Sequence, residues 1–236
     1  MTGKMVRLKA LWGRAKEILR ENGLLVLLKS SIMFLIIPFY ERNVYYLFKY
    51  SVKNDANPNE AILKLKMMDI KCKVVTSNMD ADRLESENFY FRSYPTDHNE
   101  DRKTYSRWLD QGAIAFCTFV GKDFAGITWV VTSQQTQDSL KTLPIKVGYS
   151  NKEAFGRGAW VNPKYRKLGV YGFTITNRDR FLTDMGISVL RNVVHSTDKN
   201  GRALQKTVGS KRYGEARAKR ILFWSFWEEI LENKFV

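Results

Sequence analysis

Apolar residues recur along this chain in short runs that are typical of β-strands. Residues 70–76 alternate apolar and polar side chains, which predicts a half-buried strand. Two longer apolar runs flank the turn Gly121-Lys122-Asp123 and predict a β-hairpin over residues 113–120 and 124–132. Three more segments have strand-like patterns: residues 158–161, 189–194 and 213–226. A β-sheet is therefore expected to form the centre of the domain.

Helical patterns lie between these strands. Residues 80–86 predict a short helix, and residues 102–111 predict a second one with Trp108 and Leu109 on one face. Two further helices are expected over residues 173–185 and 201–208. From residue 70 onward, the predicted order is strand, two helices, three strands, helix, strand, helix and strand. These elements are expected to belong to one mixed domain.

Residues 1–60 differ in character and are expected to form a helical extension before a domain over residues 61–236. The opening is basic, and residues 23–38 are apolar except where Lys29, Ser30 and Ser31 interrupt them. The uninterrupted pieces are shorter than the roughly 20 residues that a membrane-spanning helix needs. No small-residue cleavage site follows this segment, so a signal peptide is not expected.

Two interpretations of the extension stay open. In the first, it packs on the domain or on a second subunit, which would give a homodimer. In the second, residues 1–50 lie in the plane of a membrane surface, with basic side chains toward lipid headgroups and aromatic side chains at the interface. We favour packing, and keep contact with a membrane surface as the alternative.

Composition adds a strong positive charge. The 236 residues carry 39 Lys and Arg against 24 Asp and Glu, a net charge of +15, which predicts an anionic partner. Coenzyme phosphates, nucleic acid and an acidic membrane surface all qualify. Cys72 and Cys117 are distant in sequence, and so are His98 and His195, so neither a disulfide framework nor a zinc motif is expected. Cys117 is expected to be a buried thiol, and a reducing cytoplasm fits this cysteine usage.

The most informative stretch is residues 160–172. A strand-like run ends at Val161, and a basic turn after Pro163 leads into a helix. Free N–H groups of such a turn and of the helix N-terminus converge on one point, where the helix dipole favours an anion. Gly169 and Gly172 allow the backbone to approach that anion without a Cβ in the way. The stretch therefore predicts a phosphate-binding loop.

This stretch resembles the coenzyme-A loop of the GNAT (GCN5-related N-acetyltransferase) superfamily, whose pattern is Val-x-Pro-x-x-Arg-x-x-Gly-x-Gly/Ala. Val161, Pro163, Arg166 and Gly169 match it, and Tyr171 stands where the last small residue belongs. The resemblance implies that the backbone N–H groups of this loop bind the pyrophosphate of acetyl-CoA or another acyl-CoA. The cofactor-binding residues that it implies are Trp160, Val161, Arg166, Lys167, Leu168, Gly169, Val170, Tyr171, Gly172, Asp198 and Asn200.

The resemblance also implies the fold, from about residue 70 to the C-terminus. It implies an α/β (α+β) domain with a mixed, mostly antiparallel central sheet flanked by helices. The strands at residues 158–161 and 189–194 would splay apart and admit the pantetheine arm. An amine would then attack the thioester directly. A base, an N–H group that holds the oxyanion and an acid for the thiolate would assist.

The tyrosine that often serves as this acid in the family has no counterpart here. If Asp198 takes the place of the family's asparagine, Gly209 fits the glycine that follows, and the tyrosine position is Gln205. If Asn200 takes that place, the tyrosine position is Thr207 and the glycine spacing fails. Either the thiolate leaves without a dedicated acid, or another group supplies the proton, or activity is weak.

The base is equally open. The positions that often carry it in the family are Phe155, Gly156 and Arg157 here, and none of these is a base at neutral pH. Glu153 is the nearest carboxylate. His195 ends the next strand, and an imidazole commonly serves as a base near neutral pH. Both are candidates for the catalytic base, with a structural role as the alternative for each.

Residues 89–100 occupy the region that usually sets substrate specificity in this family, and Tyr94, Asp97 and Glu100 are candidates to contact the substrate. We expect a coenzyme-A-dependent N-acyltransferase, most simply an acetyltransferase, that acts on a primary amine of a small molecule or a protein. The alternative is a catalytically degenerate basic module that binds nucleic acid or a membrane surface. Nucleic acid is the less favoured partner, because no RNA-binding aromatic motif or recognition helix is visible.

Overall fold

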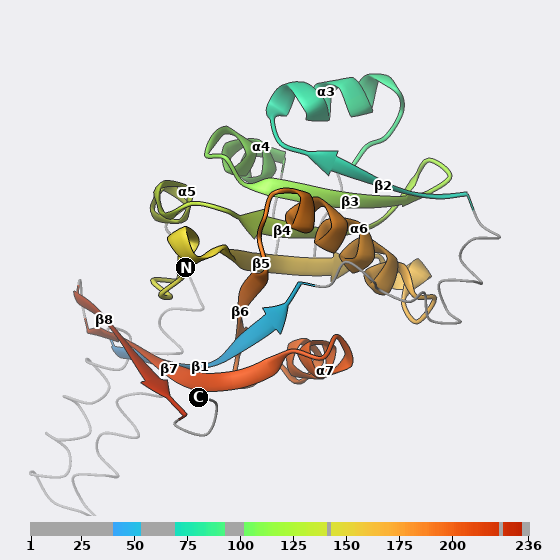
Figure 1. Cartoon of the computed structure of the whole chain (residues 1–236). Coiled ribbons are helices and arrows are strands. Elements are labelled where there is room, and N and C mark those ends of the chain that lie inside the picture. Colours follow the sequence, from blue (N-terminus) through green and yellow to red (C-terminus); the bar gives the residue numbers. More distant parts are fainter. Residues whose placement is uncertain (1–39, 53–68, 93–101, 141–142, 222–223, 233–236) are drawn as a thin grey trace, which may run out of the picture. The chain divides into compact units, whose positions relative to one another are not determined.

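The computed structural model describes residues 40–52, 69–92, 102–140, 143–221 and 224–232 (Figure 1). Its strands form one mixed sheet in the order β2-β3-β4-β5-β6-β1-β7-β8. The first four strands in this order are antiparallel neighbours. They are β2 (Ile70–Val75), β3 (Ile114–Val120), β4 (Asp123–Val131) and β5 (Glu153–Val161). The other four are β6 (Val189–His195), β1 (Tyr40–Ser51), β7 (Lys211–Ile221) and β8 (Trp224–Leu231).

Helices connect the strands and cover the sheet. The described α-helices are α3 (Asn78–Ser86), α4 (Arg102–Asp110), α5 (Gln134–Ser139), α6 (Val170–Asp184) and α7 (Lys199–Thr207). Two single 3₁₀ turns, η2 (Tyr149–Asn151) and η3 (Pro163–Tyr165), flank β5. None of the described helices combines the length and the apolar composition that a membrane span requires.

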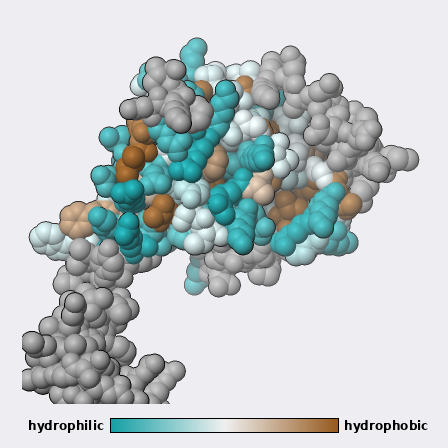
Figure 2. All heavy atoms as spheres, turned by 90° about the horizontal axis from the view of Figure 1, so that it is seen from below, coloured by the Kyte–Doolittle hydropathy of each residue, from teal (hydrophilic) through white to brown (hydrophobic). Residues whose placement is uncertain are grey.

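The chain divides into two compact units. The larger one comprises Tyr45–Ala216 and Glu229–Val236, and it contains every element discussed below. The smaller one comprises Met1–Val44 and Arg217–Glu228, and its described residues are strand ends of β1, β7 and β8. In that smaller unit, Trp224 and Phe226 are 70% and 50% exposed. Figure 2 shows that the surface viewed from below is mostly hydrophilic, with hydrophobic patches between polar ones.

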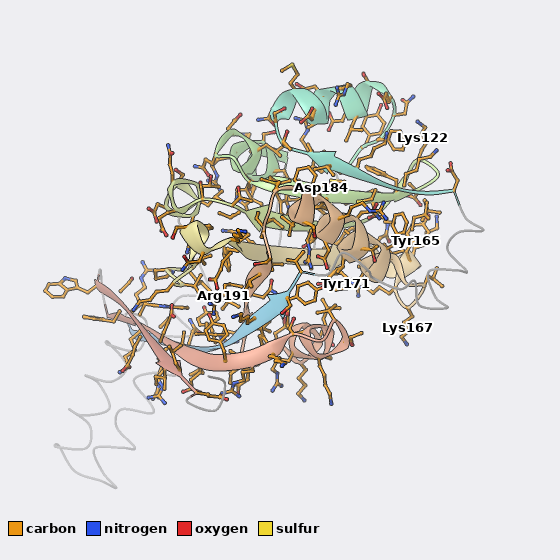
Figure 3. The ribbon with its side chains drawn as sticks, viewed as in Figure 1. Lys122, Tyr165, Lys167, Tyr171, Asp184 and Arg191 are labelled. Atoms are coloured by element: carbon orange, nitrogen blue, oxygen red, sulfur yellow. The ribbon has the colours of Figure 1, made fainter. Side chains whose placement is uncertain are left out.

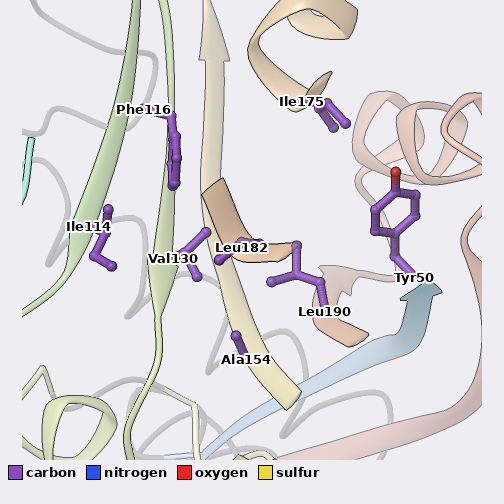
Figure 4. Packing of buried hydrophobic residues seen from close by; sticks show 8 residues of the cluster. All are labelled: Tyr50, Ile114, Phe116, Val130, Ala154, Ile175, Leu182 and Leu190. Carbon is purple, nitrogen blue, oxygen red and sulfur yellow. The ribbon is translucent and has the colours of Figure 1, made fainter. Parts of the chain in front are cut away.

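Helices pack on both faces of the sheet. On one face, Leu182 of α6 belongs to a buried cluster with Val130 and Leu190 (Figure 4). Consecutive side chains of a strand point to opposite faces, so Trp129 lies on the other face from Val130. There it meets Trp108 of α4 edge-on, with the ring centroids 5.0 Å apart. The core therefore lies on both sides of β3, β4 and β5.

Most of the elements predicted between residues 70 and 208 are confirmed, with ends that move by a few residues. β5 begins at Glu153, earlier than predicted. The prediction missed its first half because Gly156 and Gly158 interrupt the apolar pattern there. The single strand predicted over residues 213–226 is two strands, β7 and β8. Helix α5 was not predicted, and it is capped by Ser133, whose hydroxyl accepts the Thr136 N–H. Cys117 is fully buried in β3, as predicted.

Residues 40–51, which we expected within a helical extension, form strand β1 instead. β1 pairs antiparallel with β6, placing Phe48 opposite Asn192 and Tyr50 opposite Leu190. Aromatic residues favour strands because their rings pack well on a pleated surface, and both Phe48 and Tyr50 are buried here. The end of the expected extension is therefore part of the sheet. Residues 1–39, to which the packing and membrane interpretations mainly refer, lie outside the described part.

An ion pair joins β5 and β6 where they run parallel. Arg191 Nη2 and Nε donate to Glu153 Oε1 and Oε2 over 2.6 and 2.9 Å. Glu153 also accepts the N–H of Gly148 over 2.9 Å, and the Arg191 guanidinium lies 4.6 Å from the ring centre of Tyr213. Burial by itself raises the pKa of Glu153, but these hydrogen bonds outweigh it and the net shift of the pKa is downward. The carboxylate is therefore ionised and fixed at neutral pH.

Breaking this pair should destabilise the domain. Arg191→Met leaves the largely buried Glu153 carboxylate without its cation, a change that costs about 3 kcal/mol in buried pairs. The pKa of Glu153 is lower in the folded state, so the stabilisation is complete above the ordinary glutamate pKa of about 4.3. It is lost as the pH falls through the folded-state pKa. Urea unfolding should show a wild-type advantage at neutral pH that shrinks in acid.

The matched control is Arg180→Met on the exposed side of α6, which removes the same charge without an ion pair among the described residues. It should leave the free energy of unfolding nearly unchanged. A loss of stability in Arg191→Met that is independent of pH would contradict the role given to the pair.

Candidate active site

β5 and β6 pair only over their first halves and then separate. Their parallel register runs from Glu153 opposite Val189 to Gly156 opposite Asn192. Beyond this point β5 continues to Val161 and stays paired with β4 on its other side. Within the described chain, the edge of β5 beyond Gly156 therefore has no strand partner. Its backbone groups are available to an extended ligand that lies in the gap between the two strands.

Two glycines shape the closed end of this gap. Gly158 is an extra residue opposite the Thr128–Trp129 step of β4, and it makes a β-bulge with φ +54°. A Cβ on Gly156 would come within 2.2 Å of Asn192 Oδ1. A side chain at 156 would therefore require the Asn192 amide to move. The closed end of the gap therefore lies between the Asn192 side chain and the bulge at Gly158.

The turn between η3 and α6 forms a cradle of backbone N–H groups, which we define as residues 166–172. Gly169 caps α6 with φ +90°, a conformation that residues with a Cβ rarely adopt. Figure 3 shows Lys167 beside the N-terminal end of α6. The N–H groups that make no well-formed hydrogen bond to a described residue are those of Lys167, Gly169, Val170, Tyr171 and Gly172. Several unsatisfied donors at a helix N-terminus suit an anion such as a phosphate.

Side chains fix the cradle against the end of β5. Tyr165 Oη and Lys164 Nζ both donate to Asp123 Oδ2 over 2.7 Å. Arg166 Nε donates to the carbonyl oxygen of Val161 over 3.0 Å. These contacts tie the turn to the start of β4 and to the last residue of β5. The position of the cradle is therefore set before any ligand arrives.

Helix α7 follows the open end of β6. Its N-cap, Asp198, accepts the Gly201 N–H over 2.8 Å and so satisfies the N-terminus of its own helix. Asn200 is an exposed residue in the first turn. Gln205, at the expected tyrosine position, is buried, and its Oε1 accepts the Ser210 hydroxyl over 2.8 Å. This position of α7 therefore carries no ionisable group.

The two candidate bases lie at opposite ends of the strands. His195 ends β6 on the open side of the gap, with Nδ1 2.7 Å from the Thr197 hydroxyl oxygen. Its ring meets the Tyr45 ring edge-on at 5.1 Å. Glu153 lies at the closed side, where the ion pair with Arg191 and the lowered pKa disfavour proton transfer.

The side chains next to the bulge are aromatic and basic. The Arg157 guanidinium lies 4.2 Å from the centre of the Trp108 ring. Trp160 is buried and stacks on Phe124, with the ring centroids 5.6 Å apart. Its indole nitrogen finds no acceptor among the described residues. Trp160 therefore contributes a backbone edge to the gap while its side chain packs in the core.

The structure brings together residues 160–172, and it places Glu153 at the closed side of the gap and His195 at its open side. Tyr94, Asp97 and Glu100 lie outside the described part. The sequence reasoning missed the bulge at Gly158, for which a glycine inside a strand pattern was an available signal. It also missed Asn192, and no local pattern marks that residue.

No family model and no curated protein matches the sequence. Solved structures do match. One is described as a GCN5-related glucosamine N-acetyltransferase region in a fungal multi-domain GH3 β-N-acetylglucosaminidase, with a TM-score of 0.54 and 12% identity. It covers 85% of this chain, whereas this chain spans only 23% of the fungal protein. Another is a conserved protein of unknown function from Staphylococcus epidermidis, with a TM-score of 0.51 and 14% identity over 84% of this chain and 67% of that one.

Identities this low are informative about the fold alone. The fungal match agrees with the mixed central sheet flanked by helices that the resemblance implied. The chain has a GNAT-like fold.

Proposed function

We propose that this protein is a coenzyme-A-dependent N-acyltransferase, most simply an acetyltransferase, that acylates a primary amine. The observation that carries the proposal is the cradle, where five backbone N–H groups without well-formed partners gather at the N-terminus of α6. The cradle follows β5, the strand whose edge beyond Gly156 has no partner among the described strands. An anionic group with an extended arm fits this combination.

Acyl-CoA has that chemistry. Its pyrophosphate suits the N–H groups of residues 167–172, and Arg166 and Lys167 place positive charge beside them. Its pantetheine amides suit the free edge of β5 beyond Gly156. When bound, acyl-CoA would supply an activated thioester carbonyl to the amine.

The chain's own groups would then assist the transfer. The backbone N–H groups on the free edge of β5 would hold the carbonyl oxygen as negative charge develops on it. His195, at the open side of the gap, is the candidate to take the proton of the amine. Glu153 would keep β5 and β6 together below the gap through Arg191.

A degenerate binding module is the second candidate. The observations that favour it are Gln205 at the expected acid position and Arg157 where a base was expected. Calorimetry with CoA and turnover of acetyl-CoA on a panel of primary amines separate the two. Binding with turnover supports the enzyme, binding without turnover favours a module that has lost catalysis, and no binding removes the acyltransferase proposal.

The first prediction for this site concerns the cradle. Gly169→Glu should abolish CoA binding, because a Cβ strains the backbone at φ +90° and a carboxylate repels the pyrophosphate. Arg166→Ala should weaken binding by about 1–3 kcal/mol, the range for losing a charged hydrogen-bond partner. Isothermal titration calorimetry measures both effects.

Gly186→Glu is the matched control. Gly186 follows the other end of α6, also has a positive φ (+75°), and has open space where a Cβ would stand. This variant shares the backbone strain and the added charge but should bind CoA like the wild type. Equal loss of binding in both glycine variants would mean that the cradle is not the phosphate site.

The second prediction concerns the base. His195→Ala should lower kcat/KM by about 10²–10⁴-fold and remove the acidic limb of its pH profile. Glu153→Gln, compared at a temperature where it is folded, should keep that limb, because the carboxylate is engaged by Arg191. An unchanged profile in His195→Ala would exclude His195 as the base.

A further inference from the structure

The hairpin formed by β7 and β8 exposes aromatic side chains next to its turn. β7 ends at Ile221 and β8 begins at Trp224, so only two residues connect the strands. The side chains of Trp224 and Phe226 are 70% and 50% exposed, and no other described aromatic side chain is as exposed. Aromatic rings that remain in water next to one another are typical of a surface that binds a partner.

The hairpin register places a basic side chain beside this aromatic pair. Residues that flank a two-residue connection lie opposite each other, so counting back from the turn places Lys219 opposite Phe226. A hydrogen bond far from the turn agrees with this register, because the Glu232 N–H donates to the Tyr213 carbonyl oxygen over 2.9 Å. These two residues are equally far along their strands from the turn. Since opposite residues share one face of a sheet, Lys219 lies on the same face as Phe226 and Trp224.

Charge changes sign along the hairpin. Next to the turn, Lys219 and Arg220 are exposed, and neither forms an ion pair with a described residue. The carboxylates lie farther from the turn, at Glu215 on β7 and at Glu228 and Glu229 on β8. The end of the hairpin is therefore aromatic and basic, whereas its middle is acidic. We define the tip as Lys219, Arg220, Trp224 and Phe226.

This order of groups matches the surface of a bilayer that contains anionic lipids. Tryptophan favours the headgroup level of a membrane, where its apolar ring leaves water while the indole N–H keeps a polar partner. Basic side chains close to that level are attracted to anionic headgroups. Carboxylates are repelled by the same headgroups, and here they lie away from the turn. A bilayer surface therefore accommodates the tip when the turn points toward it.

Two other partners fit the tip less well. A single-stranded nucleic acid stacks its bases on aromatic rings that follow one another along a basic groove. Here the next residue after Phe226 on the same strand face is Glu228, which would repel the phosphates. A second copy could pair with β8, the outermost strand of the described sheet. An antiparallel copy would bring the acidic end of one strand beside the aromatic end of the other.

The compact unit that contains the tip has further positive charge. It also includes the N-terminal segment of the chain. Residues 1–39 carry seven Lys or Arg and two Glu. Attraction to an anionic surface increases with each basic residue that comes near it, so this segment would strengthen a contact that the tip makes.

We propose that the tip docks this protein on the surface of a bilayer that contains anionic phospholipids. Trp224 and Phe226 enter the headgroup region, and Lys219 and Arg220 contact the lipid phosphates. The contact is peripheral. It is independent of the acyltransferase function proposed above. It also differs from the membrane contact considered for residues 1–50, because the β7–β8 hairpin makes it.

The test uses the full chain and vesicles of phosphatidylcholine with or without phosphatidylserine. The protein should sediment with the phosphatidylserine vesicles, and salt should weaken the binding by screening. Trp224→Ala combined with Phe226→Ala should weaken it by at least about 10-fold, the effect of burying one such side chain. Lys219→Gln combined with Arg220→Gln should weaken it by about 20–30-fold, since each basic residue near the surface contributes about 5-fold.

Matched control variants alter exposed side chains elsewhere. Met79→Ala combined with Tyr90→Ala removes apolar side chains that are 78% and 46% exposed. Lys103→Gln combined with Arg180→Gln removes two exposed basic charges from α4 and α6. Both pairs should bind vesicles like the wild type. Melting temperatures should show that every variant is folded, because all the altered side chains are exposed.

Fluorescence quenching tests insertion of the tip directly. Brominated lipids quench a tryptophan that enters the bilayer, so vesicles that contain them should quench part of the wild-type fluorescence. Trp224→Phe keeps an aromatic ring at the tip and should still bind, but that part of the quenching should be lost. Equal quenching in both proteins would contradict insertion of Trp224.

The remaining outcomes are also distinct. A full-length protein that does not sediment with phosphatidylserine vesicles overturns the proposal. Wild-type binding by Trp224→Ala/Phe226→Ala also overturns it, and would assign the contact to another part of the chain. Without vesicle binding, oligouridylate binding that this variant loses would make the tip a nucleic-acid site. Without vesicle binding, a dimer that the same variant dissociates would make the tip a subunit interface.

Discussion

The separation of two parallel strands is the constraint on which the site depends. β5 and β6 share a register only as far as Gly156 and Asn192. At that pair the Asn192 side chain fills the space of a Cβ, and the bulge at Gly158 bends β5 immediately afterwards. Below the pair, Arg191 and Glu153 hold the strands together. The result is a gap with one closed end and one open end.

An open gap would normally leave two unpaired strand edges, which is costly in a sheet. Here β1 reduces that cost, because it pairs with β6 along the part that has left β5, as far as His195 opposite Tyr45. β4 does the same for β5, as far as Val161 opposite Gly126. Each separated strand therefore keeps one neighbour, and only the facing edges are free to bind a ligand.

Helix α6 is fixed on both sides of the gap that it crosses. On one side the Thr174 hydroxyl is 2.6 Å from the Thr118 hydroxyl of β3. On the other side Asp179 accepts a hydrogen bond from Tyr50 of β1. Asp179 and Tyr50 are buried in an otherwise apolar core, where charged groups are tolerated only when they are paired. These links hold the cradle over the end of β5.

The sequence by itself determined the local features of this protein. Residues 160–172 carried enough signal to predict a strand, a glycine-bearing basic turn and a helix that starts with free N–H groups, since each depends on neighbours in the chain. Tertiary structure decided the rest. The aromatic segment that became β1 found its place only by pairing with β6, some 140 residues later, and Glu153 was committed to Arg191 by strand register. Pairing and packing join residues that are far apart in the chain, and no local pattern encodes which of them will meet.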